Sequence, residues 1–128
     1  MQTQHAVVWL DHRQAKVFGF DRDHSEEATI KTLKGFDQAH KHAGTVDGSR
    51  TTTDVKFLHN IVEALGDAQE WLIVGPGQAK DELVKHIKAH DHTLANRIVG
   101  VEASDHPTDG QIVAHARTFF HGADRMIG

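Results

Sequence analysis

The residues of this sequence that are best suited to contact a ligand are basic and imidazole side chains in one segment that also contains glycines. They are Lys34, His40, Lys41, His42, Gly44, Gly48, Ser49 and Arg50. From Lys31 to Arg50 the sequence has four Lys or Arg against two Asp, whereas the whole chain has a formal net charge of -4. A cationic segment on an acidic body is suited to docking on RNA phosphates. The alternative is a solvated surface loop with incidental charges.

Two histidines outside that segment have a spacing that suits metal binding. His86 and His90 lie four residues apart in a predicted helix and therefore share a face. This spacing is acceptable for zinc ligands, but the sequence fixes no third ligand. Histidine pairs on helices of a histidine-rich chain are usually solvated. We therefore expect no resident metal or cofactor, and keep His86 and His90 as weak candidates for a metal site.

Composition excludes several classes of protein. A chain of 128 residues fits a single domain covering 1–128. Cysteine is absent, which excludes disulfides, thiol nucleophiles and cysteine-ligated metals. The longest apolar run, 6–10, is far shorter than the roughly 20 residues that a membrane span needs, and no secretory signal is visible. We therefore expect a cytoplasmic protein with no membrane partner.

Hydrophobic periodicity predicts strands and helices in a defined order. The apolar segment 6–10 is typical of a central strand, 15–20 of its hairpin partner, and 28–34 of an edge strand. A helix from 54, a buried strand at 71–74, a helix after Gly77, a strand at 98–101 and a last helix capped by Thr108 and Gln111 follow. Trp9, Trp71, Phe119 and Phe120 are expected in the core. The order β-β-β-α-β-α-β-α predicts an α/β fold, a mixed five-stranded sheet with helices on its faces.

This order occurs in RNase H-like folds, and four segments allow a narrower comparison. They are 8–18 (VWLDHRQAKVF), 40–44 (HKHAG), 71–83 (WLIVGPGQAKDEL), and 99–102 (VGVE) followed by 105–107 (DHP). On these segments the chain resembles the middle domain of archaeal and eukaryotic peptide-chain release factors and of pelota. It is most similar to short bacterial release-factor-like proteins often labelled translational machinery proteins. The resemblance implies an RNase H-like fold and a ribosome or structured RNA, tRNA or rRNA, as partner.

The resemblance also implies a catalytic tripeptide that this sequence lacks. In release factors the loop between the third strand and the first helix carries Gly-Gly-Gln, which enters the peptidyl-transferase centre. Here 43–50 reads AGTVDGSR, with no adjacent glycines and no glutamine beside either one. Gln38 lies in the same loop between Asp37 and Ala39, so it does not match the tripeptide. We therefore expect a translation-associated protein that binds the ribosome or RNA, without assigning any catalytic residue.

Two alternatives remain. The first is a hydrolase of peptidyl-tRNA or RNA, for which Asp11, Glu63 and Asp109 are the candidate metal-binding carboxylates. Gly75 stands where nucleases of this fold class carry another acidic residue, which argues against this alternative. The turn 75–77 could bind an anion at the start of a helix, but it lacks a full phosphate-binding fingerprint. The second is a structural protein that assembles into a homo-oligomer through the strand edge at Lys31–Lys34.

Overall fold

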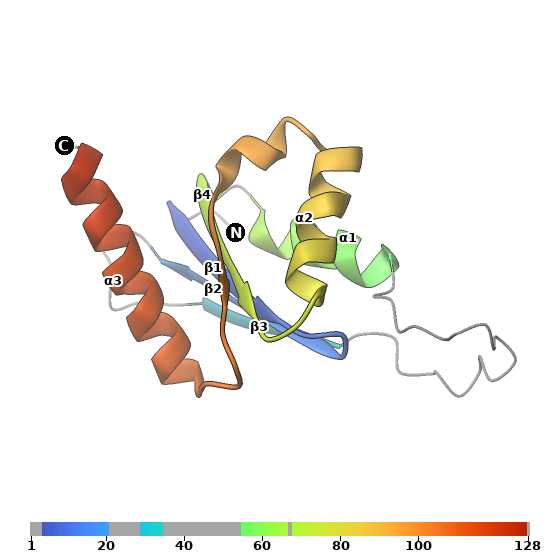
Figure 1. The fold of residues 1–128 in the computed structure, drawn as a ribbon, viewed down its shortest axis with the longest axis horizontal. Coiled ribbons are helices and arrows are strands. Elements are labelled where there is room, and N and C mark those ends of the chain that lie inside the picture. The colour runs from blue at the N-terminus through green and yellow to red at the C-terminus, as the bar shows by residue number, and fades with distance from the viewer. Residues whose placement is uncertain (1–3, 21–28, 35–54, 67, 128) are drawn as a thin grey trace, which may run out of the picture.

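The computed structural model describes residues 4–20, 29–34, 55–66 and 68–127. These residues form one five-stranded sheet and the helices that cover it (Figure 1). The elements are β1 (His5–Leu10), β2 (Gln14–Phe20), β3 (Thr29–Lys34), α1 (Val55–Leu65), β4 (Glu70–Gly75), α2 (Ala79–His90), the short 3-10 helix η2 (Leu94–Arg97), β5 (Ile98–Ala103) and α3 (Asp109–Ile127). The predicted mixed α/β architecture is confirmed.

The strands lie in the order β3-β2-β1-β4-β5. β1 pairs with β2 and β2 with β3 in antiparallel fashion, whereas β1–β4 and β4–β5 are parallel pairs. Four strands, β1, β3, β4 and β5, therefore run in the same direction and end at one edge of the sheet. We call this edge the carboxyl edge.

The sheet separates two hydrophobic cores, because helices cover both of its faces (Figure 1). All six residues of β1 are buried, as predicted for a central strand. Its alternate side chains enter different cores: Val8 packs on the side of α1 and α2, and Trp9 on the side of α3. Trp71 is buried in the core of α1 and α2, and Trp9 and Phe120 are the large aromatic side chains buried in the core of α3. Phe119 is partly buried against the α3 core.

α1 ends before Gly66, and α2 and α3 begin within two residues of the starts that the sequence predicts. The main-chain N–H of Gly66 donates to the carbonyl of Val62, and Gly66 has a φ of 56°, a conformation that favours glycine. Thr53, the predicted N-cap of α1, lies outside the described residues. The apolar spacing of this helix predicts Val55 on its core face, but Val55 is 62% exposed, and the first buried residues of α1 are Phe57 and Leu58.

β5 is an apolar strand, as its sequence predicts, but it is only half-buried. It lies at the edge of the sheet, and Val99 and Val101 are 41% and 39% exposed. The register shifts between Trp71 and Leu72, which leaves Val99 without a partner in β4. A Cβ on Gly100 would lie 2.8 Å from the ring of Phe119, so glycine allows α3 to pack closely on this strand.

Candidate functional site

The carboxyl edge of the sheet gathers segments that are far apart in the sequence. The β1–β2 turn (11–13), the β4–α2 turn (76–78) and the β5–α3 connection (104–108) all leave from it. β3 also ends there, since Lys34 is in register with Gln14 at the start of β2. In sheets with parallel strands, ligands bind outside the carboxyl ends of the strands. This edge is therefore the candidate functional site.

The cationic segment predicted from the sequence follows directly from this edge. Its first residue, Lys34, is the last residue of β3. The other predicted contact residues lie outside the described residues: His40, Lys41, His42, Gly44, Gly48, Ser49 and Arg50. The structure thus shows where the segment departs from the sheet, and its role in binding stays a prediction.

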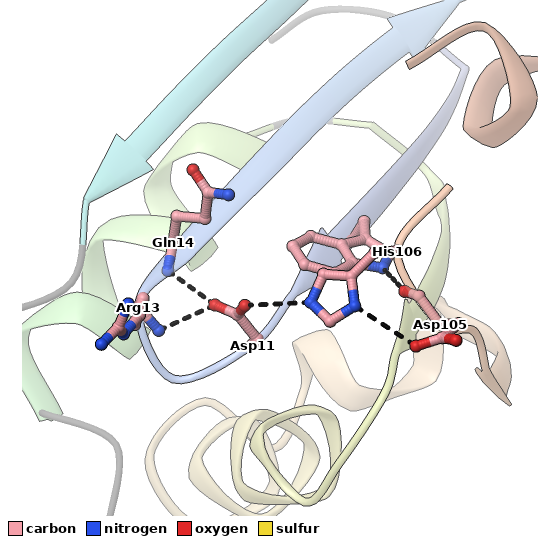
Figure 2. Close-up of polar contacts among 6 residues, drawn as sticks. Asp11, Arg13, Gln14, Asp105 and His106 are labelled. Atoms are coloured by element: carbon pink, nitrogen blue, oxygen red, sulfur yellow. Dashed lines mark hydrogen bonds and ion pairs between the residues drawn. The ribbon is translucent and has the colours of Figure 1, made fainter. Parts of the chain in front are cut away.

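Asp11 closes the β1–β2 turn. Its Oδ1 accepts hydrogen bonds from the main-chain N–H groups of Arg13 at 2.8 Å and Gln14 at 2.9 Å (Figure 2). The main-chain N–H of Asp11 donates to the carbonyl of Gln14 at 3.0 Å. An Asp that bonds its own backbone two residues on is typical of a tight turn. Asp11 therefore has a structural role at the hairpin, while its Oδ2 faces the neighbouring segment.

His106 lies between two carboxylates, in front of that second oxygen. Its Nε2 is 3.7 Å from Asp11 Oδ2, and its Nδ1 is 3.2 Å from Asp105 Oδ1 (Figure 2). The imidazole ring lies 5.2 Å from the ring of Trp9, whose Nε1 donates to the carbonyl of Asp105 at 2.8 Å. These contacts attach the β5–α3 connection to β1. The imidazole of His106 is 65% exposed, and its two ring nitrogens face the two carboxylates.

Further charged side chains at this edge form ion pairs. Lys16 Nζ is 2.9 Å from Asp109 Oδ1, which links β2 to the first turn of α3. His12 Nε2 is 3.8 Å from Glu82 Oε2 on α2. Arg13 is exposed at the tip of the hairpin. The described part of the edge therefore presents the guanidinium of Arg13 and the imidazole of His106 outward, among side chains of both charges.

The carboxylates proposed for two-metal hydrolysis lie in separate surroundings. Asp109 pairs with Lys16, and Glu63 pairs with His59 within α1, Nε2 to Oε2 at 3.2 Å. Over the part of the chain that the structure describes, three or more His, Asp or Glu side chains nowhere come together as a metal site. A Cβ on Gly75 would lie 2.1 Å from the carbonyl oxygen of Leu10, so β4 has no room there for an acidic side chain.

The two remaining candidates from the sequence are the turn 75–77, which precedes α2, and the pair His86 and His90, which lies on α2. The turn before the helix is closed by Lys80 Nζ, which donates to the carbonyl of Gly77 at 2.6 Å. His86 and His90 do lie side by side, with ring centroids 4.6 Å apart. His86 Nε2 is buried and has no hydrogen-bond partner. Burial lowers the pKa of His86 below its usual value, and His90 lowers it further.

The site residue that the sequence did not single out is His106. In the sequence, the segment 105–107 contributes only to the family resemblance. Nothing in its own pattern indicates a contact with Asp11. The strand order carries a signal: a strand at 98–101 parallel to β4, which is itself parallel to β1, ends at the same edge of the sheet as 10–11. The proximity of His106 to Asp11 could therefore be predicted from the order and direction of the strands.

In the described residues no helix is long and apolar enough to span a membrane.

No family model and no curated protein matches the chain. Solved structures do match: the Pelota protein of Thermoplasma acidophilum has a TM-score of 0.59 at 17% identity, over 83% of this chain and 29% of its own. An archaeal translation termination factor, aRF1, has a TM-score of 0.55 at 18% identity, over 88% and 32%. Dom34 of S. cerevisiae, a translation termination-like factor involved in RNA quality control, has a TM-score of 0.56 at 12% identity, over 88% and 31%.

The chain therefore spans about a third of the length of the solved structures that it matches. At these identities the likeness is one of fold. The mixed α/β domain described here is similar to one part of Pelota and of termination-like translation factors.

Proposed function

We propose that this chain is a cytoplasmic, translation-associated protein that binds the ribosome or structured RNA through residues 34–50 and the adjoining carboxyl edge of the sheet. The observation that carries the proposal is the fold likeness to Pelota, aRF1 and Dom34, which extends over more than four fifths of the chain. The element order also fits an RNase H-like domain, as the sequence resemblance implies.

The distribution of charge supports the choice of surface. The segment from Lys31 to Arg50 is cationic within a chain of net charge -4. Its first four residues end β3, and the rest follows that strand end, which lies next to the β1–β2 turn, where Arg13 is exposed. Lys and Arg contacts to phosphates supply most of the affinity of non-specific RNA binding. An acidic body with one cationic rim thus favours a single orientation on a polyanion.

The proposed role is binding without hydrolysis. The segment lacks the Gly-Gly-Gln tripeptide. The candidate carboxylates Asp11 and Asp109 are engaged in the hairpin and in the Lys16 ion pair. The test of this part is the release of labelled peptide from stalled ribosomes, for which we expect no activity above the rate without protein. Release that depends on His106 or His40 would instead favour the hydrolase.

Co-sedimentation with purified ribosomes tests the binding itself. We expect the wild-type protein to sediment with ribosomes at low salt and to dissociate as the salt concentration rises. The double substitution Lys41→Glu and Arg50→Glu removes two cationic side chains from the segment. If both contact phosphates, the slope of log affinity against log salt falls by about 2, and the affinity falls at all salt concentrations.

The matched control reverses two exposed lysines elsewhere. Lys85→Glu and Lys88→Glu on α2 change the net charge by the same amount as the segment variant. We expect this control to bind ribosomes nearly as the wild type does. Equal losses in both variants would mean that binding follows bulk charge, and no sedimentation of the wild type at low salt would contradict the proposal entirely.

A further inference from the structure

The C-terminal half of α2 carries an imidazole pair that the proposed function does not use. His86 and His90 lie one helical turn apart, with ring centroids at 4.6 Å and ring planes inclined by 40°. Residues four apart on a helix project in the same direction, so the two rings are neighbours by virtue of the backbone itself. The pair is therefore preorganised, because α2 is anchored in the core through Leu83 and Ile87.

His86 has an unused nitrogen in this arrangement. Its Nε2 is buried and makes no hydrogen bond. A buried polar nitrogen without a partner costs free energy, which a ligand at that nitrogen offsets. His90 is exposed beside it, so one nitrogen of the pair is sheltered and the other ring is accessible to solvent. Such an arrangement admits a small ion at the surface of the helix.

We propose that His86 and His90 form a chelate for a divalent transition-metal ion, Zn²⁺ or Cu²⁺, across one turn of α2. Imidazole is a preferred ligand of both ions. The remaining coordination positions are taken by water. The proposal is independent of ribosome binding, since it concerns the C-terminal half of α2 and not the carboxyl edge, where α2 begins.

A rearranged protein of identical composition provides the sharpest test. Lys88→His combined with His90→Lys moves one histidine to a position two residues from His86, on a different face of the helix. Zn²⁺ is titrated calorimetrically into the full chain after removal of metals with a chelator. We expect one tightest site in the wild type and an affinity weakened by roughly tenfold or more in the rearranged protein, which corresponds to about 1.4 kcal/mol or more.

Two further variants locate the ion, because the chain has 12 histidines. His115→Gln with His121→Gln removes two exposed imidazoles from α3 that lie six residues apart, and we expect it to keep the wild-type affinity for Zn²⁺. Cu²⁺ bound to the wild type should show an electron paramagnetic resonance spectrum with coupling to two imidazole nitrogens. In the rearranged protein this two-nitrogen signature should be lost.

Two results would overturn the proposal. One is an unchanged Zn²⁺ affinity and stoichiometry in the rearranged protein, with far-UV circular dichroism and thermal unfolding showing an intact fold. The other is a loss of Zn²⁺ binding with His40→Gln and His42→Gln, while the rearranged protein still binds, which would assign the ion to residues 34–50.

Discussion

Gly75 shows how a single residue type is imposed by two neighbouring strands. It ends β4 where β4 lies against the end of β1, and any Cβ there would lie 2.1 Å from the carbonyl oxygen of Leu10. The obstacle is backbone, which cannot move aside as the end of a flexible side chain can. Gly77, two residues on, is exposed and has no atom within 4 Å of an added Cβ. The two glycines of one turn therefore have different reasons to be glycine.

This difference predicts opposite effects of the same substitution. Gly75→Ala should destabilise the protein by about 1–3 kcal/mol, because β1 and β4 must separate to admit the methyl group. Gly77→Ala should be neutral or stabilising by about 0.5 kcal/mol, because it restricts only the unfolded chain. Urea unfolding followed by circular dichroism measures both. Equal free energies of unfolding for the two variants would show that the close approach at Leu10 is absent.

Residue-level chemistry was predictable from the sequence only where the contact is local. The turn at Asp11 and the proximity of His86 to His90 depend on neighbours a few residues away. The hydrogen bond from Trp9 to Asp105 joins residues 96 positions apart, and the contact of Asp11 with His106 is of the same kind. No periodicity encodes such a pair. It arises only once the parallel strands bring their ends together.

At the level of the elements, α3 shows how local signals define a helix end. The main-chain N–H of Gln111 donates to Thr108 Oγ1 at 3.1 Å, and Gln111 Oε1 accepts from the N–H of Thr108 at 2.9 Å. This is the capping box that the spacing of Thr108 and Gln111 predicts. It satisfies two main-chain donors that the first turn of a helix otherwise leaves open. The start of α3 is therefore fixed independently of the sheet.

Removal of the cap should weaken α3 by a defined amount. Thr108→Ala is expected to cost about 1 kcal/mol of stability, since the side-chain oxygen that accepts from Gln111 is lost. Thr118→Ala, on an exposed position within the same helix, is the control and should stabilise by about 0.5 kcal/mol through helix propensity. Chemical denaturation of both variants measures the difference. A Thr108→Ala protein as stable as the wild type would contradict a role for the box.

The strands and helices were predicted well where their burial matches the apolar spacing of their sequence. The prediction was less accurate for the strand at the border of the sheet. β1, β4 and the three helices have buried faces that the apolar spacing indicates. β5 has the apolar composition of a buried strand, yet half of its side chains are exposed, because the sheet ends there. Composition cannot reveal which strand is last. That depends on the direction of the crossover after α2.

The whole molecule consists of two cores that share one sheet. Trp71 lies in the core beneath α1 and α2, and Trp9 in the core beneath α3. Each indole is tied to the main chain, Trp71 Nε1 to the carbonyl of Ala68 and Trp9 Nε1 to that of Asp105, both at 2.8 Å. The adjacent strands β1 and β4 contribute to both cores, so neither core is independent of the other.

The shared sheet predicts a single cooperative unfolding transition. Trp71→Phe and Trp9→Phe each leave one tryptophan, which reports on one core by fluorescence. Leu83→Ala on α2 should destabilise the protein by about 2–5 kcal/mol. We expect this loss to be the same with either tryptophan as the reporter, although Leu83 lies only in the core of Trp71. A Trp9 signal that keeps its midpoint while the Trp71 signal shifts would show two units that unfold separately.

The exposed β5 edge has a different consequence, which concerns what happens when two molecules meet. Val99 and Val101 give this border of the sheet an apolar, β-branched surface, and the bulge beside Val99 interrupts its regular hydrogen-bonding pattern. A strand with a kinked register is a poor template for stacking another strand in line. The irregularity at Trp71 and Leu72 thus makes β5 a poorer template for strand addition than a regular edge strand of the same composition.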